Sequence, residues 1–383
     1  MARRPIDFQG SPRSSVGIEW ELMCVDQATG DLAPAAPAIL SALDRDDSGF
    51  PHSTAEFLTN TVEVVSAPHP RVADAVADLA GEVRAVVDAG RDLGVDIMCS
   101  GTHPFALWQN QAITPGNEHY RTLIERTQYW GRQLLIWGLH THVGISRVEK
   151  ALPILNGMVA YYPHFQALSA SSPFWTGIDT GYASNRALMF QQLPTAGLPP
   201  AFAEWSEYER AVAELTHVGM IDGPGELHWD LRPSPKWGTI ELRFCDGLST
   251  LREVGALTAL AQCLVEELEQ RLDRGEEIRP MQPWFARENK WRGARYGLDA
   301  IVITSPDGDE RPVTDDIRET LERLAPIAER LECAAELADV ELILDRGASY
   351  QRQRRVAAAH DGDTRPVVAA LVAEFATGEP STM

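Results

Sequence analysis

Three short segments of the chain alternate charged or imidazole side chains with apolar ones. They cover residues 17–22, 139–143 and 240–244. Successive side chains of a β-strand point to opposite faces, so each segment would place its polar residues together on one face. These polar residues form three pairs: Glu19 and Glu21, His140 and His142, and Glu241 and Arg243. The opposite face of each strand would be apolar and would pack against a core.

The polar face carries residue types that bind divalent cations. Two carboxylates two residues apart on a strand lie about 7 Å apart, because each residue adds about 3.3 Å. At an effective dielectric constant near 20 they repel by roughly 2 kcal/mol. Glu63 or Glu241 would add to this repulsion. A half-buried cluster in mutual repulsion needs a counter-charge, and hard oxygen ligands select Mg²⁺ or Mn²⁺.

Mg²⁺ usually binds through a few carboxylates together with phosphate oxygens of a substrate. The pattern therefore predicts ATP-dependent phosphoryl transfer, with Arg243 available for a carboxylate or for the transferred phosphoryl group. The alternative is a set of open antiparallel strands whose polar face meets water. A single Glu-x-Glu pair would favour that alternative, whereas three such strands favour a site.

The composition restricts the class of protein. The chain has 383 residues, 44% of them hydrophobic, and a formal net charge of -21. This acidic excess argues against a nucleic-acid or anionic-membrane surface. Its five cysteines are scattered and lack a C-x-x-C spacing, which is typical of free thiols in a reducing compartment. Because no apolar run approaches 20 residues and no signal peptide is recognised, we expect a cytoplasmic protein without a membrane partner.

Apolar periodicity and turn residues predict an order of strands mixed with helices, followed by helices only. Strands are expected at 15–25, 61–65, 95–99, 134–146, 226–231 and 238–245, the last two forming a hairpin. Helices are expected at 35–45, 70–94, 118–133, 203–217 and from about 147 to 170. Further helices follow at 251–274, 284–297, 313–331, 333–344, 348–359 and 364–376. This order is typical of an α+β layered domain rather than a regular βαβ winding.

Common nucleotide and hydrolase motifs are absent from the sequence. There is no G-x-x-x-x-G-K-[ST] loop and no G-x-G-x-x-G after a strand. Neither a G-x-S-x-G elbow nor an H-E-x-x-H helix occurs. ATP would therefore not be held by a P-loop, and a dinucleotide oxidoreductase is excluded.

Several strings resemble bacterial type-2 glutamate–cysteine ligases, which are ATP-dependent carboxylate–amine ligases. They include GIEWEL at 17–22, GTHP at 101–104, GLHTHVG at 138–144, DTGYAS at 179–184, WDLRPSP at 229–235 and ENKW at 288–291. The resemblance covers roughly residues 14–376. It implies one catalytic domain over 14–378, helical from about 251. The implied fold is an antiparallel sheet funnel of the glutamine synthetase and guanido kinase type, flanked by helices.

Carried over residue by residue, the resemblance also implies roles. The metal-binding residues would be Glu19, Glu21, Glu63, His140 and Glu241, with Glu56 as a weaker candidate. Phosphate contacts would come from His142, Arg232, Lys290 and Arg295, although the two histidines could exchange roles. Glu241 and Arg243 would be catalytic, and Arg243 and Arg186 would bind the acyl substrate. Many relatives have an acid where this chain has Trp20, a departure that should leave the metal site intact because Trp20 faces the core.

Several further segments remain open between two interpretations. The arginines outside the strands, including Arg292, could bind phosphate or lie on solvated helix faces. A basic cluster from Arg346 to Arg355 could close over nucleotide or pair with acids. The loops at 193–201 and 176–187 could be lids or ordinary connections. Histidines such as His119 and His228 show no partner pattern, and His103 is expected to be structural.

The implied reaction has two steps. ATP phosphorylates a carboxylate, typically the γ-carboxylate of glutamate, and an amine, cysteine in the reference reaction, then displaces phosphate to form the amide. The alternatives are a metal-dependent amidohydrolase, since His-x-His is also a hydrolytic metal signature, and a phosphagen-type kinase. An inactive relative that only binds ligand is a third. The family likeness is compatible with a homodimer, while the physiological carboxylate and amine cannot be read from the sequence.

Overall fold

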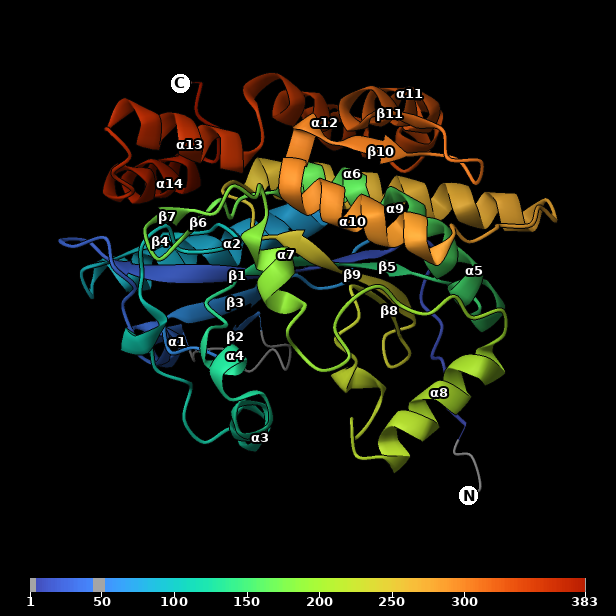
Figure 1. Ribbon diagram of the computed structural model, residues 1–383, viewed down its shortest axis with the longest axis horizontal. Coiled ribbons are helices and arrows are strands. Elements are labelled where there is room, and N and C mark those ends of the chain that lie inside the picture. Colours follow the sequence, from blue (N-terminus) through green and yellow to red (C-terminus); the bar gives the residue numbers. More distant parts are fainter. Residues whose placement is uncertain (1–4, 44–51, 383) are drawn as a thin grey trace.

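The computed structural model describes residues 5–43 and 52–382, and its centre is a seven-stranded antiparallel sheet (Figure 1). The strand order is β2-β3-β1-β5-β9-β8, and β4 pairs with the second half of β1. The strands are β1 (Val16–Asp26), β2 (Ser53–Ala55), β3 (Thr61–Val65), β4 (Val95–Met98), β5 (Gly138–Gly144), β8 (Leu231–Ser234) and β9 (Thr239–Asp246). The three strands singled out by their alternating polar residues, β1, β5 and β9, are neighbours in this sheet.

One face of the sheet is apolar and is covered by helices. Contacts to this face come from α2 (Val72–Arg91), α5 (Val148–Met158), α6 (Tyr162–Ser169) and α9 (Leu251–Asp273). In Figure 1, α2, α6 and α9 lie above the sheet. The predicted inward residues are at most 2% exposed: Ile18, Trp20, Leu22, Leu139, Val143, Ile240, Leu242 and Phe244. The prediction that these residues form one packed face is confirmed.

The opposite face carries the polar residues and is partly enclosed by shorter elements. These are α3 (Glu118–Thr127), α4 (Tyr129–Arg132) and α7 (Asn185–Phe190), and Figure 1 shows α3 and α4 below the sheet. The helix predicted over 118–133 is divided between α3 and α4 at Gln128, whose φ of 49° lies in the left-handed region and ends the first helix. The two faces therefore differ in chemistry as the alternation predicts.

The helices of the C-terminal part pack on the covered side of the sheet. They are α10 (Pro283–Tyr296), α11 (Val313–Arg330), α12 (Ala334–Arg346), α13 (Ser349–Ala359) and α14 (Arg365–Thr377). The expectation of helices only is wrong at one point, because β10 (Ile301–Ile303) and β11 (Glu310–Pro312) form a small hairpin. Each of its strands has three residues, too few for a period-2 pattern, although Gly308 marks the turn with a φ of 88°.

Two other predicted boundaries are wrong, and a third cannot be compared at its end. The long helix to 170 consists of α5, a 3₁₀ turn at Val159–Tyr161 and α6, because Pro163 cannot continue the hydrogen-bond ladder of the preceding turns. The hairpin before 246 is confirmed, but its first strand is β8 at 231–234 and not 226–231. Pro233 is tolerated there because β8 lies at the edge of the sheet. The helix expected over 35–45 is α1 (Ala36–Leu43), and its last two predicted residues lie outside the described residues.

Candidate active site

Strand register brings the predicted polar residues together on one face. Glu19 lies opposite His140 across β1 and β5, and Glu21 lies opposite Glu63 across β1 and β3. His142 lies opposite Glu241 across β5 and β9. In an antiparallel pair, directly opposed side chains point to the same face about 5 Å apart. The register alone therefore builds a cluster from four strands that are far apart in sequence.

Two groups of ligand atoms in this cluster have the spacing of a metal site. One group is Glu19, His140 and Glu241, and the other is Glu21, Glu63 and His140. The ligand atoms of each group lie within 4.8 Å of one another. Carboxylate oxygens with one imidazole suit hard divalent cations such as Mg²⁺ or Mn²⁺. The residues present therefore fit a divalent cation, and His140 would be shared by two ions.

Crowding of buried carboxylates is strongest on the β3 side of the cluster. Burial and the nearby carboxylate of Glu56 raise the pKa of Glu21 to about 8. The pKa of Glu63 is raised well above its usual range by burial and by three neighbouring carboxylates. Burial also raises the pKa of Glu56, which lies beside this cluster but belongs to neither of the two groups. On this side the predicted mutual repulsion is present.

The β9 side differs, because its carboxylates already have cationic partners. Burial alone would raise the pKa of Glu241, but Arg243 and Arg232 outweigh it and lower that pKa. Nε of Arg232 donates to Oε2 of Glu241 at 2.7 Å, and Nη1 of Arg243 donates to Oε1. The pKa of Glu19 also lies well below its usual range, since two imidazoles outweigh its burial. The expected repulsion is present here too, since Glu19 acts to raise the pKa of Glu241, but the partners of Glu19 and Glu241 outweigh it.

The two histidines have opposite environments. The pKa of His140 is lowered to about 4 by burial and by Arg243, which keeps the imidazole neutral as a metal ligand must be. Burial opposes charge on His142 too, but Glu241 and Glu19 outweigh it and raise its pKa. Nδ1 of His142 lies 2.8 Å from the hydroxyl of Thr239. This difference supports His140 as the ligand and His142 as a cationic contact.

Alternation with Glu241 places Arg243 on the polar face, and an irregularity in β9 begins at Arg243. β9 has one residue more than β5 at this point, so Arg243 and Phe244 together oppose His140. Such a bulge bends the strand and re-aims its side chains. The Nε of Arg243 is buried and has no hydrogen-bond partner in the described chain. Arg243 thus keeps donor capacity for a ligand while its Nη1 is held by Glu241.

Arg186 reaches the same place from α7. It is 2% exposed, and its Nη2 donates to the carbonyl oxygen of Arg243 at 3.3 Å. Gly138 makes this approach possible, because a Cβ there would lie 2.2 Å from Nη2 of Arg186. The amide of Gly138 also donates to Oε2 of Glu21 at 2.5 Å. The predicted substrate arginine is therefore brought into the cluster by an element outside the sheet.

A cavity of about 230 Å³, which we call the funnel cavity, opens in front of this cluster. Its lining includes six of the predicted residues: Glu21, Glu56, His140, Arg186, Arg232 and Arg243. It also includes Tyr120, His119, Phe190 and His228, which the sequence analysis did not assign. These four lie outside the alternating strands, so no spacing rule could select them. The funnel cavity is the candidate active site.

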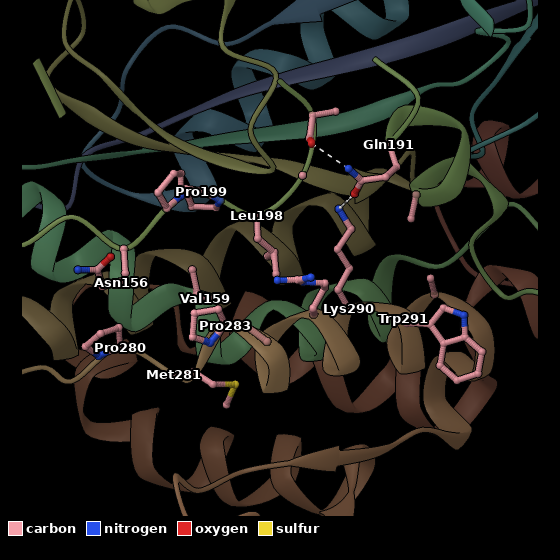
Figure 2. A pocket seen from close by; sticks show the side chains of 18 of the residues that line it. Asn156, Val159, Gln191, Leu198, Pro199, Pro280, Met281, Pro283, Lys290 and Trp291 are labelled. Carbon is pink, nitrogen blue, oxygen red and sulfur yellow. Dashed lines mark hydrogen bonds between the residues drawn. The ribbon is translucent and has the colours of Figure 1, made fainter. Parts of the chain in front are cut away.

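Two of the predicted phosphate contacts lie elsewhere. Nζ of Lys290 donates to Asp230 at 2.6 Å and to Gln191 at 2.7 Å, and it lines a separate cavity of about 600 Å³. Figure 2 shows this larger cavity between α10, with Lys290 and Trp291, and the loop that carries Leu198 and Pro199. Its lining is mostly apolar and includes none of the clustered carboxylates. Lys290 is therefore not at the funnel cavity.

Arg295 also points away from the funnel cavity. It donates to the carbonyl oxygen of Gly181 and lies over the ring of Tyr182. Arg292 pairs with Glu288 and Glu310 on α10 and β11. Both arginines have carbonyl or acidic partners outside the funnel cavity, and neither lines it. The basic cluster at 346–355 is likewise paired: Arg352 with Glu253 and Glu374, and Arg354 with Asp179.

The sequence profile described as Glutamate-cysteine ligase family 2 (GCS2) matches residues 15–370. The chain belongs to this family. A protein from Clavibacter michiganensis, provisionally named glutamate–cysteine ligase 2, is 60% identical over 376 residues, which cover 98% of each chain. A relative with the same provisional name from Leifsonia xyli is 57% identical over 97% of this chain and 99% of its own. The resemblance stated from the sequence motifs is confirmed.

Solved structures show that this member of the glutamate–cysteine ligase family 2 has the fold of other ligases. The glutamate–cysteine ligase of Francisella tularensis, solved in complex with AMP, matches with a TM-score of 0.64 at 14% identity, over 95% of this chain and 92% of its own. A bifunctional glutathione synthetase from Pasteurella multocida matches with a TM-score of 0.68 at 14% identity, over 95% of this chain and 52% of its own. The predicted α+β class with a flanked antiparallel sheet is confirmed.

Proposed function

We propose that this family member is an ATP-dependent carboxylate–amine ligase that forms an amide through an acyl phosphate. The reference reaction would join the γ-carboxylate of glutamate to the amine of cysteine, with release of ADP and phosphate. The observation that carries the proposal is the funnel cavity, whose lining combines Glu21, Glu56 and His140 with the guanidinium groups of Arg186 and Arg243. Carboxylates suit metal-bound ATP, and guanidinium groups suit a carboxylate or a transferred phosphoryl group.

The metal is part of the proposal. Glu19, Glu21, Glu63, His140 and Glu241 would hold one or two Mg²⁺ or Mn²⁺ ions. When bound, such an ion would neutralise the phosphate oxygens of ATP and favour transfer of the γ-phosphoryl group. Glu56 also lines the funnel cavity. Its carboxylate would add negative charge beside Glu21 and so favour a bound cation.

The arginines and His142 would hold the reacting groups in place. Arg243 would donate to the transferred phosphoryl group, since its Nε is free of partners in the described chain. Arg186, which lies beside Arg243, would hold the acyl substrate, and Arg232 and His142 would contact phosphate. Arg232 is fixed for such a role, because its Nη1 donates to the carbonyl oxygens of Gly225 and Leu227 at 2.6 and 2.7 Å. Preorganised donors of this kind stabilise charge at little reorganisation cost.

The two enzymatic alternatives are not favoured. A metal-dependent amidohydrolase usually has His-x-His on the first strand of a (β/α)₈ barrel, whereas here the histidines lie on the central strand of an open antiparallel sheet. A phosphagen-type kinase would use one acceptor and form a phosphagen, and the family match supports a ligase instead. A single catalytic domain over 14–378, a cytoplasmic location and a homodimer stay predictions. None of the described helices is long and apolar enough to cross a membrane.

The proposed function is tested by a screen for ADP release over pairs of carboxylates and amines in the presence of Mg²⁺. Glutamate and cysteine form the first pair, and other amino acids follow as amines. ADP that appears only when both a carboxylate and an amine are present supports a ligase. ADP formed with a single guanidino acceptor would support the kinase instead, and amide hydrolysis without ATP would support the amidohydrolase.

A further inference from the structure

The funnel cavity adjoins a second cavity of about 360 Å³, which we call the outer cavity. Its walls are α3 residues, Pro194 and the segment from Gly219 to Glu226. Four residues line both cavities: His119, Leu123, Glu226 and His228. The two cavities therefore meet at these four side chains. A small molecule in the outer cavity would have only these side chains between it and the funnel cavity, which Arg186 and Arg243 line.

The ring of His228 is held in one orientation at this junction. Its Nδ1 lies 3.2 Å from the carbonyl oxygen of Pro194, and its backbone N–H donates to the hydroxyl of Thr195 at 2.9 Å. A carbonyl oxygen can only accept, so Nδ1 carries the proton of the neutral ring. Nε2 then has a free lone pair, and no hydrogen-bond partner for it is found in the part of the chain that the structure describes.

Burial, together with two nearby arginines, keeps the ring of His228 neutral. Burial comes first among the causes that lower the pKa of His228 to about 4, followed by Arg243 and Arg232. Phosphate groups bound at these two arginines would offset their effect on the pKa of His228, while the effect of burial would remain. The remaining charged neighbours at the junction are His119 and Glu226, whose Nδ1 and Oε1 lie 3.4 Å apart. His119 is thus already paired, whereas Nε2 of His228 is not.

We propose that His228 is the proton acceptor for the amine nucleophile, which reaches the funnel cavity through the outer cavity. This inference rests on the proposed function, because an amino acid amine is protonated at neutral pH and cannot attack in that form. The ammonium group gives one proton to Nε2, its nitrogen then bonds to the acyl carbon, and the bond from that carbon to the phosphate oxygen breaks. Phosphate leaves with the electron pair and takes the second proton from nitrogen, so the products are the amide and hydrogen phosphate.

The test separates the two half-reactions in the full-length protein. Hydroxylamine is largely unprotonated at pH 7 and traps an acyl phosphate as a hydroxamate without a proton acceptor. His228→Asn keeps a donor at the place of Nδ1 and removes the basic Nε2. We expect this variant to lower amide formation with an amino acid by about 10²–10⁴, the range of general base catalysis, and to change hydroxamate formation by less than about threefold. His217→Asn, at an exposed position on α8 (Trp205–His217), is the matched control and should change neither rate.

A pH profile gives a second readout that a structural role would not move. In His228→Asn, amide formation should rise about tenfold per pH unit toward the pKa of the free amine, because only the unprotonated amine reacts. His228→Gln is the second variant if the first does not fold. Equal loss of hydroxamate and amide, or loss of neither, would overturn the role of His228. A wild-type protein that forms no hydroxamate with any carboxylate would instead overturn the proposed function, and this inference with it.

Discussion

Nδ1 of His140 lies 3.0 Å from Oε2 of Glu19, the residue directly opposite it in the register of β5 and β1. The other oxygen of the same carboxylate lies 3.1 Å from Nε2 of His142. One carboxylate therefore holds both imidazoles of the β5 strand on the polar face. This arrangement separates the cluster into a side with internal charge partners, around Glu19 and Glu241, and a side without them, around Glu63.

The two sides predict opposite effects of the same substitution on stability. Glu241→Gln should lower the free energy of unfolding by on the order of 3 kcal/mol, because it leaves two buried guanidinium groups without their carboxylate. Glu63→Gln should leave it unchanged or raise it, because burial and three neighbouring carboxylates already disfavour the charged form. Urea unfolding without added metal measures both values.

Both variants should lose ATP turnover, since both residues belong to the candidate metal groups. Glu19→Gln should lose it as well. Undiminished Mg²⁺-dependent ADP release in any of these three would remove that residue from the metal site. A stability loss of equal size in Glu63→Gln and Glu241→Gln would contradict the division into two sides.

Arg243→Lys is expected to lower kcat by about 10²–10³, the usual effect of losing one preorganised donor, with little change in ATP binding. Lysine keeps the positive charge beside Glu241 but loses the planar fork, including the Nε that has no partner in the described chain. Steady-state kinetics and ATP titration check the two effects. Arg252→Lys, on a half-exposed ion pair with Asp339 and Glu379, is the matched control and should be neutral.

Weaker ATP binding at unchanged kcat in Arg243→Lys would make Arg243 a ground-state anchor for the nucleotide. The free Nε of Arg243 would then serve binding rather than the transition state.

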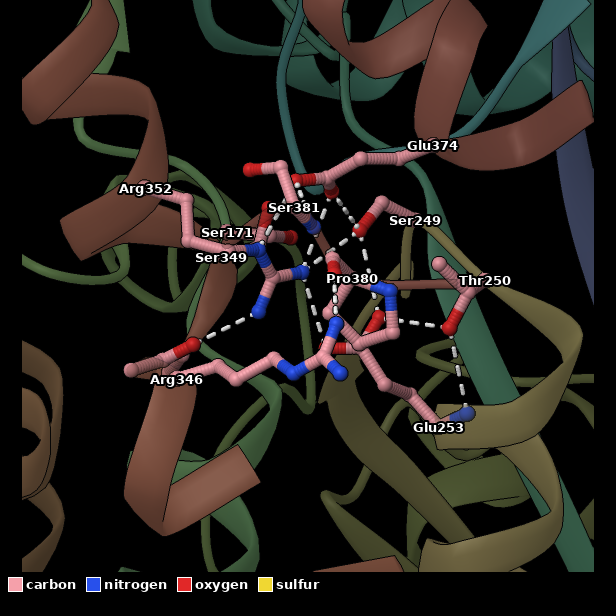
Figure 3. Close-up of polar contacts among 12 residues, drawn as sticks. Ser171, Ser249, Thr250, Glu253, Arg346, Ser349, Arg352, Glu374, Pro380 and Ser381 are labelled. Carbon is pink, nitrogen blue, oxygen red and sulfur yellow. Dashed lines mark hydrogen bonds and ion pairs between the residues drawn. The ribbon is translucent and has the colours of Figure 1, made fainter. Parts of the chain in front are cut away.

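A buried ionic network around Arg352 predicts a pH effect on stability (Figure 3). Arg352 donates to Glu253 at 2.8 Å and to Glu374 at 2.9 Å, and all three side chains are buried. Burial would raise the pKa of Glu374, but Arg352 outweighs it and lowers that pKa. A carboxyl group with a lowered folded-state pKa stabilises the fold above its unfolded pKa of about 4.3, and this stabilisation is lost as the pH falls.

Glu374→Gln should therefore lower the free energy of unfolding by on the order of 3 kcal/mol at pH 6.5, and by less at pH 4. The difference between wild type and variant at the two pH values isolates this group from the other carboxylates. Glu379→Gln, which touches the exposed pair with Arg252, is the control and should cost less than about 1 kcal/mol at either pH. A wild-type–variant difference that does not shrink between pH 6.5 and pH 4 would show that Glu374 has no lowered pKa.

The sheet and its polar face could be predicted from the sequence because alternation in a strand is local. A period of two was enough to place Glu19 and His140 on the polar face of their strands. The burial of the other face follows from the apolar residues that alternate with them. Their register was not local, and the family resemblance supplied the grouping that periodicity could not. The bulge at Arg243 depends on how β9 pairs with β5, and the split of the long helix follows from Pro163, which has no N–H to donate. Alternation reports neither of them.

Residues outside the sheet were the ones that sequence patterns could not assign. Lys290 and Arg295 have the charge of phosphate ligands, but their acidic and carbonyl partners lie outside the funnel cavity. His228 carries no pattern of its own, and its place between two cavities results from the packing of α3 and the 193–201 loop. Whether that loop or the 176–187 segment closes over substrate stays a prediction.

The most direct test of the central claim is the fate of carboxylate oxygen during turnover. Glutamate labelled with ¹⁸O in its γ-carboxylate is incubated with ATP, Mg²⁺ and an amine, and the products are analysed by mass spectrometry. An acyl phosphate intermediate predicts one ¹⁸O atom in the released phosphate for each amide formed, and no label in the nucleotide, which is ADP. Label found in AMP, or amide formed with unlabelled phosphate, would contradict activation of the carboxylate by the γ-phosphoryl group.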